Sequence, residues 1–305
     1  MNKPPTVARE PQVSAATILL LAAACGLLAA NIYYAQPLIK PIAESLGLAP
    51  QASGLIVTMT QIGYGLGLFF VVPLADLVEN RRLVLVCVAL CAGALAAAAL
   101  ATSWPAFLAC AGAIGLGSVA VQILIPLSAH LAPDATRGRV VGAVASGLMI
   151  GVMGARPVGS FIASVASWRT VFAASAVVMV VLGLVLFRKL PVRAPHIRMS
   201  YGALIVSMAR LAAATPILRR RAFYQSCLFG AFSLFWTTTP LLLAGPDYRM
   251  TQRGIALFAL AGVSGAIAAA FLATMLVPQG SPLALAVLVA AAIGVDFGVQ
   301  GNFVL

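Results

Sequence analysis

Long apolar runs, separated by short polar breaks, fill the chain from residue 15 to residue 305. Each run has about the 20 residues that an α-helix needs to cross a hydrocarbon core about 30 Å thick. A helix satisfies its own backbone hydrogen bonds, which a segment surrounded by lipid must do. The pattern therefore predicts an all-α polytopic membrane protein with about nine spans. The expected spans are 15–36, 53–77, 83–101, 105–131, 140–165, 168–187, 223–244, 254–276 and 282–305.

The lysines and arginines lie mainly in alternate breaks between these runs. If the N-terminus is cytoplasmic, the cytoplasmic segments include Lys3 and Arg9, the pair Arg81 and Arg82, and the strongly basic stretch 188–221. Cytoplasmic loops of membrane proteins carry an excess of Lys and Arg. The charge pattern therefore predicts a cytoplasmic N-terminus.

Composition indicates the same class of protein. A chain with 62% hydrophobic and 9% charged residues cannot cover itself with a water-soluble surface, so its expected surroundings are a lipid bilayer. The net charge of +12 is scattered among apolar runs and forms no continuous basic face, so no nucleic-acid partner is expected.

The residue types needed for metal binding or acid–base catalysis are sparse in the runs. The five cysteines all lie inside apolar runs, and His130 and His196 lie at the end of a run and in a break. Small buried thiols are common in hydrophobic cores without a chemical role. We therefore expect no metal, no cofactor and no enzymatic activity.

The basic stretch 188–221 divides the chain. It contains Pro191 and Pro195 and no acidic residue, which is typical of a cytoplasmic linker between helical bundles. Within it, Leu204, Met208 and Leu211 lie on one helical stripe, which predicts either a short interfacial helix or a solvated loop. The expected domains are an N-terminal bundle of six spans (1–187), the linker (188–221) and a partial C-terminal bundle (222–305).

The break after the second run contains Asp76, Arg81 and Arg82. Their spacing resembles the signature loop of the major facilitator superfamily, Gly-x-x-x-Asp-Arg-x-Gly-x-Arg-Arg. In that family the acid pairs with neighbouring helices and latches an inner gate, so the resemblance implies a gate loop here. An acid near a helix end can also bind helix-terminal amides and release them as the bundles rock.

The fifth run resembles the antiporter signature of the same family, Gly-x8-Gly-x3-Gly-Pro-x2-Gly-Gly. Gly142, Gly151 and Gly159 match its glycines, while Arg156 occupies the proline position and Pro157 follows it. Small residues at this spacing allow close helix contact beside a proline kink. Because the motif marks exporters, the resemblance implies efflux.

Arg156 is the strongest local signal in the chain. Placing a guanidinium at the centre of a membrane helix costs about 2.5–3.5 kcal/mol on insertion scales, so such a residue faces the bundle interior or a water-filled cavity. We expect it to line the substrate path, with a structural role as the alternative. Asp296 is the candidate counter-ion or proton carrier, which would make the proton the coupling ion.

Polar side chains inside the runs are the other candidates for substrate contact, with helix–helix contact as the alternative for each. Tyr34 is equally compatible with an aromatic anchor at the membrane interface. The candidates for the substrate path are Asn31, Tyr34, Gln36, Gln61, Tyr64, Gln122, Arg156, Gln225 and Trp236.

Further segments are similar to the bacterial drug-and-sugar efflux branch of the superfamily, namely 31–38, 168–172, 235–238 and 296–300. This resemblance implies a location in the bacterial inner membrane. The break 277–281 has no charge although the span count places it in the cytoplasm, and 254–269 runs directly into a segment similar to a later span. The second half is therefore expected to be incomplete.

Two functions remain open from the sequence. The first is a secondary active transporter that exports small molecules by alternating access. The second is a non-transporting membrane fragment, or a subunit that associates with other chains, which the uncharged break 277–281 favours.

Overall fold

The computed structural model describes residues 14–193 and 199–261. These residues form helices and the turns between them, and no strand occurs within the two ranges. Seven helical segments in the described residues are long and apolar enough to cross a membrane. The all-α membrane fold is thus confirmed. The seven segments are Ala15–Leu46, Pro50–Asp76, Asn80–Leu100, Trp104–Leu131, Arg137–Val165, Trp168–Lys189 and Pro216–Leu243.

The seven segments correspond to the first seven spans expected from the hydrophobic pattern. The eighth expected span is described only in its first part, where residues 252–261 are helical. The ninth, with Asp296, lies outside the described residues, as do Lys3, Arg9, His196 and the break 277–281. The total of nine spans therefore stays a prediction.

Several of the expected spans are composed of more than one helix. The first contains α1 (Ala15–Tyr33), a 3₁₀ turn η1 (Gln36–Leu38) and α2 (Ile39–Leu46), and the fourth is divided at Val119. The remaining helices are η2 (Pro50–Ala52), α3 (Leu55–Phe70), η3 (Val72–Asp76), α4 (Asn80–Leu100), α5 (Trp104–Ser118), α6 (Ala120–Leu131), α7 (Arg137–Val165), α8 (Trp168–Lys189), α9 (Tyr201–Ala214) and α10 (Pro216–Leu243).

Local capping residues explain where several helices begin. The Ser14, Ser167 and Ser200 hydroxyl oxygens each accept a hydrogen bond from the backbone N–H three residues later, at the starts of α1, α8 and α9. Such caps satisfy amide groups that have no partner within the helix. Pro216 starts α10, where a missing N–H costs nothing.

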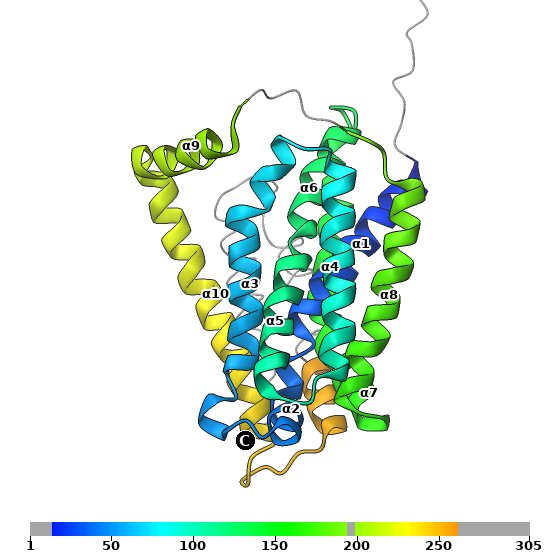
Figure 1. Cartoon of the computed structure of the whole chain (residues 1–305), viewed down its shortest axis with the longest axis vertical. Coiled ribbons are helices and arrows are strands. Elements are labelled where there is room, and N and C mark those ends of the chain that lie inside the picture. Colours follow the sequence, from blue (N-terminus) through cyan, green and yellow to red (C-terminus); the bar gives the residue numbers. More distant parts are fainter. Residues whose placement is uncertain (1–13, 194–198, 262–305) are drawn as a thin grey trace, which may run out of the picture.

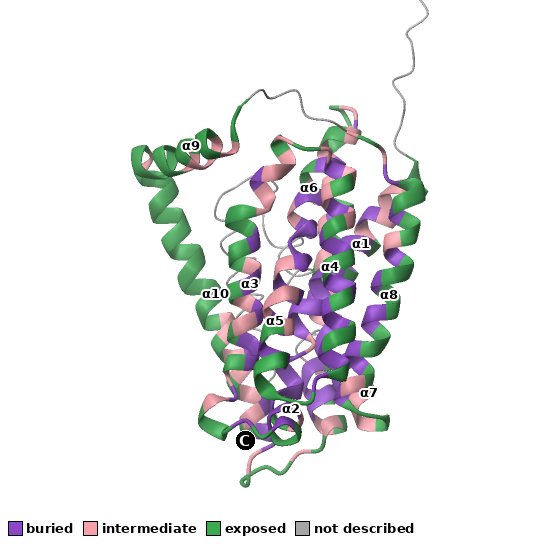
Figure 2. Ribbon diagram, viewed as in Figure 1, coloured by how far each residue is buried: buried purple, intermediate pink, exposed green. Residues whose placement is uncertain are grey.

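The helices of the first six spans pack in close pairs, α1 along α7, α3 along α5 and α4 along α8. Glycines allow this closeness. A Cβ added at Gly151 of α7 would lie 2.0 Å from the carbonyl oxygen of Gly26 in α1, and one added at Gly115 of α5 would lie 2.0 Å from the carbonyl oxygen of Thr60 in α3. Only residues without a side chain permit these backbone contacts. The buried residues accordingly concentrate in the middle of this bundle (Figure 2).

α10 has a different relation to the bundle. Near its start it stands apart from α3, and near its end it meets η1 and α2 (Figure 1). Most of its surface is exposed (Figure 2). It begins at Pro216, within the stretch expected as a linker, rather than at residue 223. Of the two alternatives for the stripe at Leu204, the structure has the helix, α9, which lies at the upper left of Figure 1 beside the start of α10.

The basic connections gather at one end of the molecule. The start of α1, the η3–α4 junction, the α6–α7 connection, the end of α8 and α9 all lie at the upper end of Figure 1. The opposite end holds α2, the α7–α8 turn and the end of α10. The fold therefore separates the arginine-rich connections from the others, while the side of the membrane that each end faces stays a prediction.

Candidate functional site

Arg156 lies in α7 beside Pro157, and only 2% of the residue is exposed. Its Nε atom donates a hydrogen bond to the Gln36 side-chain oxygen at 2.9 Å, and Nη1 donates to the backbone oxygen of Val152 at 3.1 Å. The guanidinium is therefore held in the interior by α7 itself and by η1, 120 positions earlier in the chain.

Three aromatic rings surround this guanidinium. Its central carbon lies 4.1 Å from the ring centroid of Trp236, 4.8 Å from that of Tyr33 and 5.0 Å from that of Phe232. Each cation–π contact of this kind contributes about 0.5–2 kcal/mol, with the larger values in desolvated sites. Tyr33 belongs to α1, and Phe232 and Trp236 belong to α10. Arg156 thus joins the first six spans to α10.

Two residues expected in the substrate path, Gln36 and Trp236, are therefore next to Arg156, and both are buried. A third, Tyr34, lies beside Gly159, where an added Cβ would come within 3.3 Å of Tyr34 Cδ1. In the sequence these residues are separate candidates with no pattern that relates them. The fold brings them to one region at the end of α1 and in the last third of α7.

Three further members of the region were not selected from the sequence, namely Tyr33, Phe232 and Ser160. Helical spacing offers a signal for two of them. Ser160 follows Arg156 by one turn, and Phe232 precedes Trp236 by one turn, so each shares a helix face with a selected residue.

Asn31 lies in a different environment. Its side-chain oxygen accepts a hydrogen bond from Ser175 Oγ at 2.5 Å, and its amide nitrogen lies 3.5 Å from the sulfur of Cys91, which in turn lies 3.8 Å from Ser118 Oγ. These residues belong to α1, α8, α4 and α5. The geometry supports the alternative of helix–helix contact for Asn31.

The other polar candidates occupy separate places. Gln122 Nε2 in α6 donates to the Tyr64 hydroxyl of α3 at 2.9 Å, and Gln61 lies half-buried one turn before Tyr64. Gln225 is exposed on α10. The role of each in substrate contact stays a prediction.

The gate-loop residues lie at the arginine-rich end. Arg81 donates a hydrogen bond to the backbone oxygen of Phe187 in α8 and lies 5.1 Å from the centroid of its ring. Arg82 forms an ion pair with Glu79 at 2.9 Å, while Asp76 is exposed at the end of η3. Arg81 therefore connects this loop to α8.

The three glycines of the antiporter-like pattern have unequal surroundings. Gly151 faces the backbone of Gly26 in α1, and Gly159 faces Tyr34, whereas no atom lies within 4 Å of a Cβ added at Gly142. α7 continues through Pro157 from Arg137 to Val165. Two of the three glycines thus serve the contact between α7 and the first span.

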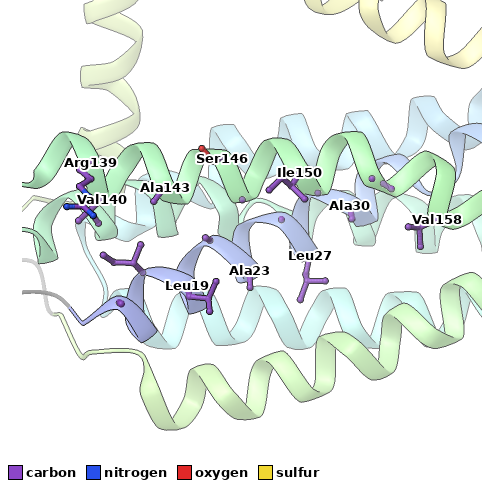
Figure 3. A pocket seen from close by; sticks show the side chains of 18 of the residues that line it. Leu19, Ala23, Leu27, Ala30, Arg139, Val140, Ala143, Ser146, Ile150 and Val158 are labelled. Atoms are coloured by element: carbon purple, nitrogen blue, oxygen red, sulfur yellow. The ribbon is translucent and has the colours of Figure 1, made fainter. Parts of the chain in front are cut away.

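A groove of about 1150 Å³ runs along the seam between α1 and α7 (Figure 3). Leu19, Ala23 and Leu27 line it from α1, and Ala143 and Ile150 line it from α7. Arg139 lies toward one end and Val158 toward the other. No sequence motif marks this groove because its lining is mostly apolar; the closely spaced small residues of α7 are the local feature that accompanies it.

Metal binding finds no support in the described residues, where no three His, Cys, Asp or Glu side chains lie close enough to share an ion. Asp296, the expected partner of Arg156 or proton carrier, lies outside the described residues. The candidate site is therefore the region defined by Arg156, Gln36, Ser160, Trp236 and the two rings of Tyr33 and Phe232, which we call the Arg156 site.

The fold and this site define the class, a polytopic all-helical membrane protein with a buried cation where its bundle meets a further span. Residues 19–302 match the family model of the Major Facilitator Superfamily. The chain belongs to this family.

Curated relatives carry transporter names. The chain is 40% identical over 246 residues to the putative uncharacterized transporter YgaY of Escherichia coli K12, which covers 81% of this chain and 62% of that protein. It is 36% identical over 273 residues to the probable transporter SCO4007 of Streptomyces coelicolor, covering 87% of this chain and 64% of that protein. The chain thus spans less than two thirds of the length of these relatives.

A solved structure with the same fold is a bacterial homologue of the human lysosomal transporter Spinster in an inward-facing and occupied conformation. The TM-score is 0.67 at 16% sequence identity, and the match covers 93% of this chain and 73% of that chain.

Proposed function

We propose that this protein is a secondary transporter that exports small molecules across the bacterial inner membrane by alternating access, with the Arg156 site in the substrate path. One observation carries the proposal: a 2% exposed arginine lies where α7 and η1 meet α10. A buried cation inside a membrane bundle is costly and is typically retained for a substrate or ion pathway.

The arrangement of α10 supports alternating access. α10 meets the first bundle near the Arg156 site and stands apart from α3 toward its start (Figure 1). Rocking of one bundle against another around a central site exposes that site to each side of the membrane in turn. We accordingly propose a first bundle (1–187), a linker and a partial third domain, expected at 188–221 and 222–305 and divided in the structure where α10 begins at Pro216, with movement at the seam between the first and the third.

The antiporter-like pattern in α7 supports the outward direction. Gly151 lies against α1 and Gly159 lies against Tyr34, so the pattern forms a seam beside the Arg156 site. We propose a cytoplasmic N-terminus and proton coupling, with Asp296 as the proton carrier.

The test measures solute movement directly. The purified chain is reconstituted into liposomes with an imposed proton gradient, and flux is followed for radiolabelled probes that include a carboxylate, a nucleoside and a cationic dye. We expect at least one probe to move, and the Arg156→Ala variant to reduce its flux about tenfold or more, since polar contacts to a charged group contribute about 1.5–3 kcal/mol each.

Arg169→Ala is the matched control, because Arg169 lies 4.2 Å from the centroid of the Trp168 ring and its removal changes the same charge outside the site. We expect this variant to retain flux. Absence of flux for all probes would favour the non-transporting fragment, and equal flux in both variants would remove Arg156 from the substrate path.

A further inference from the structure

Three buried hydrogen-bond donors in the Arg156 site have no hydrogen-bond partner in the described part of the chain. They are the Gln36 amide nitrogen, the Ser160 hydroxyl and the Trp236 indole nitrogen. The exposed fractions of these residues are 0%, 0% and 3%. Because buried polar groups in native structures are almost always hydrogen-bonded, these donors indicate a hydrogen-bond acceptor that the described residues do not supply.

The orientation of the Gln36 amide follows from Arg156. A guanidinium carries only donors, so Gln36 must present its oxygen to Arg156 Nε, and the distance between these atoms is 2.9 Å. The Gln36 amide nitrogen is then directed elsewhere and offers two hydrogens. The missing partner must accept hydrogen bonds rather than donate them.

Two of the three donors belong to residues in contact with Arg156, and the third lies one helical turn from it. Gln36 is hydrogen-bonded to it, and the Trp236 ring lies 4.1 Å from its central carbon. Ser160 follows it by one turn of α7 and shares its helix face. Three donors beside a guanidinium create a region of positive potential, which favours an anionic acceptor such as a carboxylate.

The walls of the site define the rest of the ligand. Tyr33 and Phe232 contact each other edge to face with centroids 6.3 Å apart, and Trp236 lies 6.4 Å from Phe232. Such rings favour a flat apolar body that stacks against them.

We propose that the Arg156 site binds a small carboxylate attached to a flat aromatic ring, with the carboxylate facing Gln36, Ser160 and Trp236. This inference rests on the proposed transport function and names the chemical class of its substrate. Benzoate has the required charge and shape, and benzamide is its uncharged counterpart.

The test is direct binding of radiolabelled benzoate to the purified full chain in detergent, measured by scintillation proximity. We expect saturable binding, displaced at least tenfold less effectively by benzamide than by unlabelled benzoate. Ser160→Ala and Trp236→Phe each remove one donor and are expected to weaken benzoate binding about tenfold, because each loses one hydrogen bond to a charged group.

Ser164→Ala and Trp104→Phe are matched controls. Ser164 lies in α7 and donates to the Phe161 backbone oxygen, and Trp104 is 43% exposed at the start of α5. Both are expected to bind benzoate like the unmodified chain. Monodisperse elution of all four variants in size-exclusion chromatography establishes that they are folded.

Equal displacement by benzoate and benzamide overturns the proposal, as does unchanged benzoate affinity in both site variants. If a neutral or cationic probe is transported and benzoate does not bind, the proposal that the Arg156 site binds a carboxylate is wrong, while the proposal that the protein is a transporter still holds. If benzoate binds and the two site variants weaken this binding, but no probe is transported, carboxylate binding at the Arg156 site is supported and the transport function is contradicted.

Discussion

Single residues determine how closely the spans approach one another. Where Gly26 in α1 meets Gly147 and Gly151 in α7, the backbones are in contact, and the same occurs at Gly63 and Gly112 between α3 and α5. In a bilayer the hydrophobic effect does not favour helix–helix contact over helix–lipid contact, because lipid tails are as apolar as the side chains. Close packing of small residues therefore contributes much of the stability of the helix bundle. The effect of adding one methyl group therefore depends on position.

Gly151→Ala is expected to destabilise the protein. The added Cβ would lie 2.0 Å from the Gly26 carbonyl oxygen, and overpacking of this kind costs about 1–3 kcal/mol. The measurement is the thermal unfolding temperature of the purified chain in detergent.

Gly142→Ala is the control from the same glycine pattern, because no atom lies within 4 Å of its added Cβ. Its unfolding temperature is expected to equal or exceed that of the unmodified chain, since alanine favours helix more than glycine does. Equal losses in the two variants would contradict the assignment of Gly151 to the α1–α7 contact.

At the scale of elements, residues 201–214, between α8 and α10, form the helix α9. α9 connects two parts of the molecule, since the Tyr201 hydroxyl donates to the backbone oxygen of Phe70 at the end of α3 at 2.8 Å, while Pro216 starts α10 directly after α9. The amphipathic stripe of Leu204 predicted the helix, but the prolines and positive charges of 188–221 also suggested a loop. The stretch forms helices because Ser200 caps the start of α9 and Pro216 starts α10.

Tyr201→Phe is expected to loosen α9. Removal of one neutral hydrogen bond costs about 1 kcal/mol, which raises the local opening equilibrium about fivefold. Hydrogen–deuterium exchange of residues 201–214 measures this change. Tyr248→Phe removes the hydroxyl of another partly exposed tyrosine, outside α9, and is expected to leave this exchange unchanged. Equal exchange of α9 in both variants would show that the Phe70 contact does not hold it.

At the scale of the whole molecule, the fold gathers the arginine-rich connections at one end. The excess of cytoplasmic Lys and Arg in membrane proteins then predicts which side this end faces. Ala166, between α7 and α8, and Val192, after α8, are exposed residues at opposite ends, so they report on orientation.

In a Cys227→Ala background, the Ala166→Cys variant is expected to react with a membrane-impermeant maleimide in intact cells. The Val192→Cys variant is expected to react only after permeabilisation. Cys227 is removed because it is exposed, whereas Cys25, Cys87 and Cys91 are buried. The opposite labelling pattern would place the N-terminus outside the cytoplasm.

The first seven spans follow from the amino-acid sequence alone, because the length of an apolar run is set by bilayer thickness and every residue of the run carries the signal. The sequence also identifies Arg156 as buried, since the cost of a membrane cation depends on residue type more than on neighbours. Gln36 and Trp236 are also candidates on the basis of residue type, because each is a polar side chain inside an apolar run.

Which of these residues contact one another depends on how the helices pack. Arg156 and Gln36 are 120 positions apart, and Ser175 and Asn31 are 144 apart, so no local pattern relates them. In spans that are apolar on all sides, periodicity does not specify which face turns toward which neighbour. That choice depends on the backbone contacts of glycines such as Gly151 and on the pairing of polar groups, and it exists only once the helices have packed.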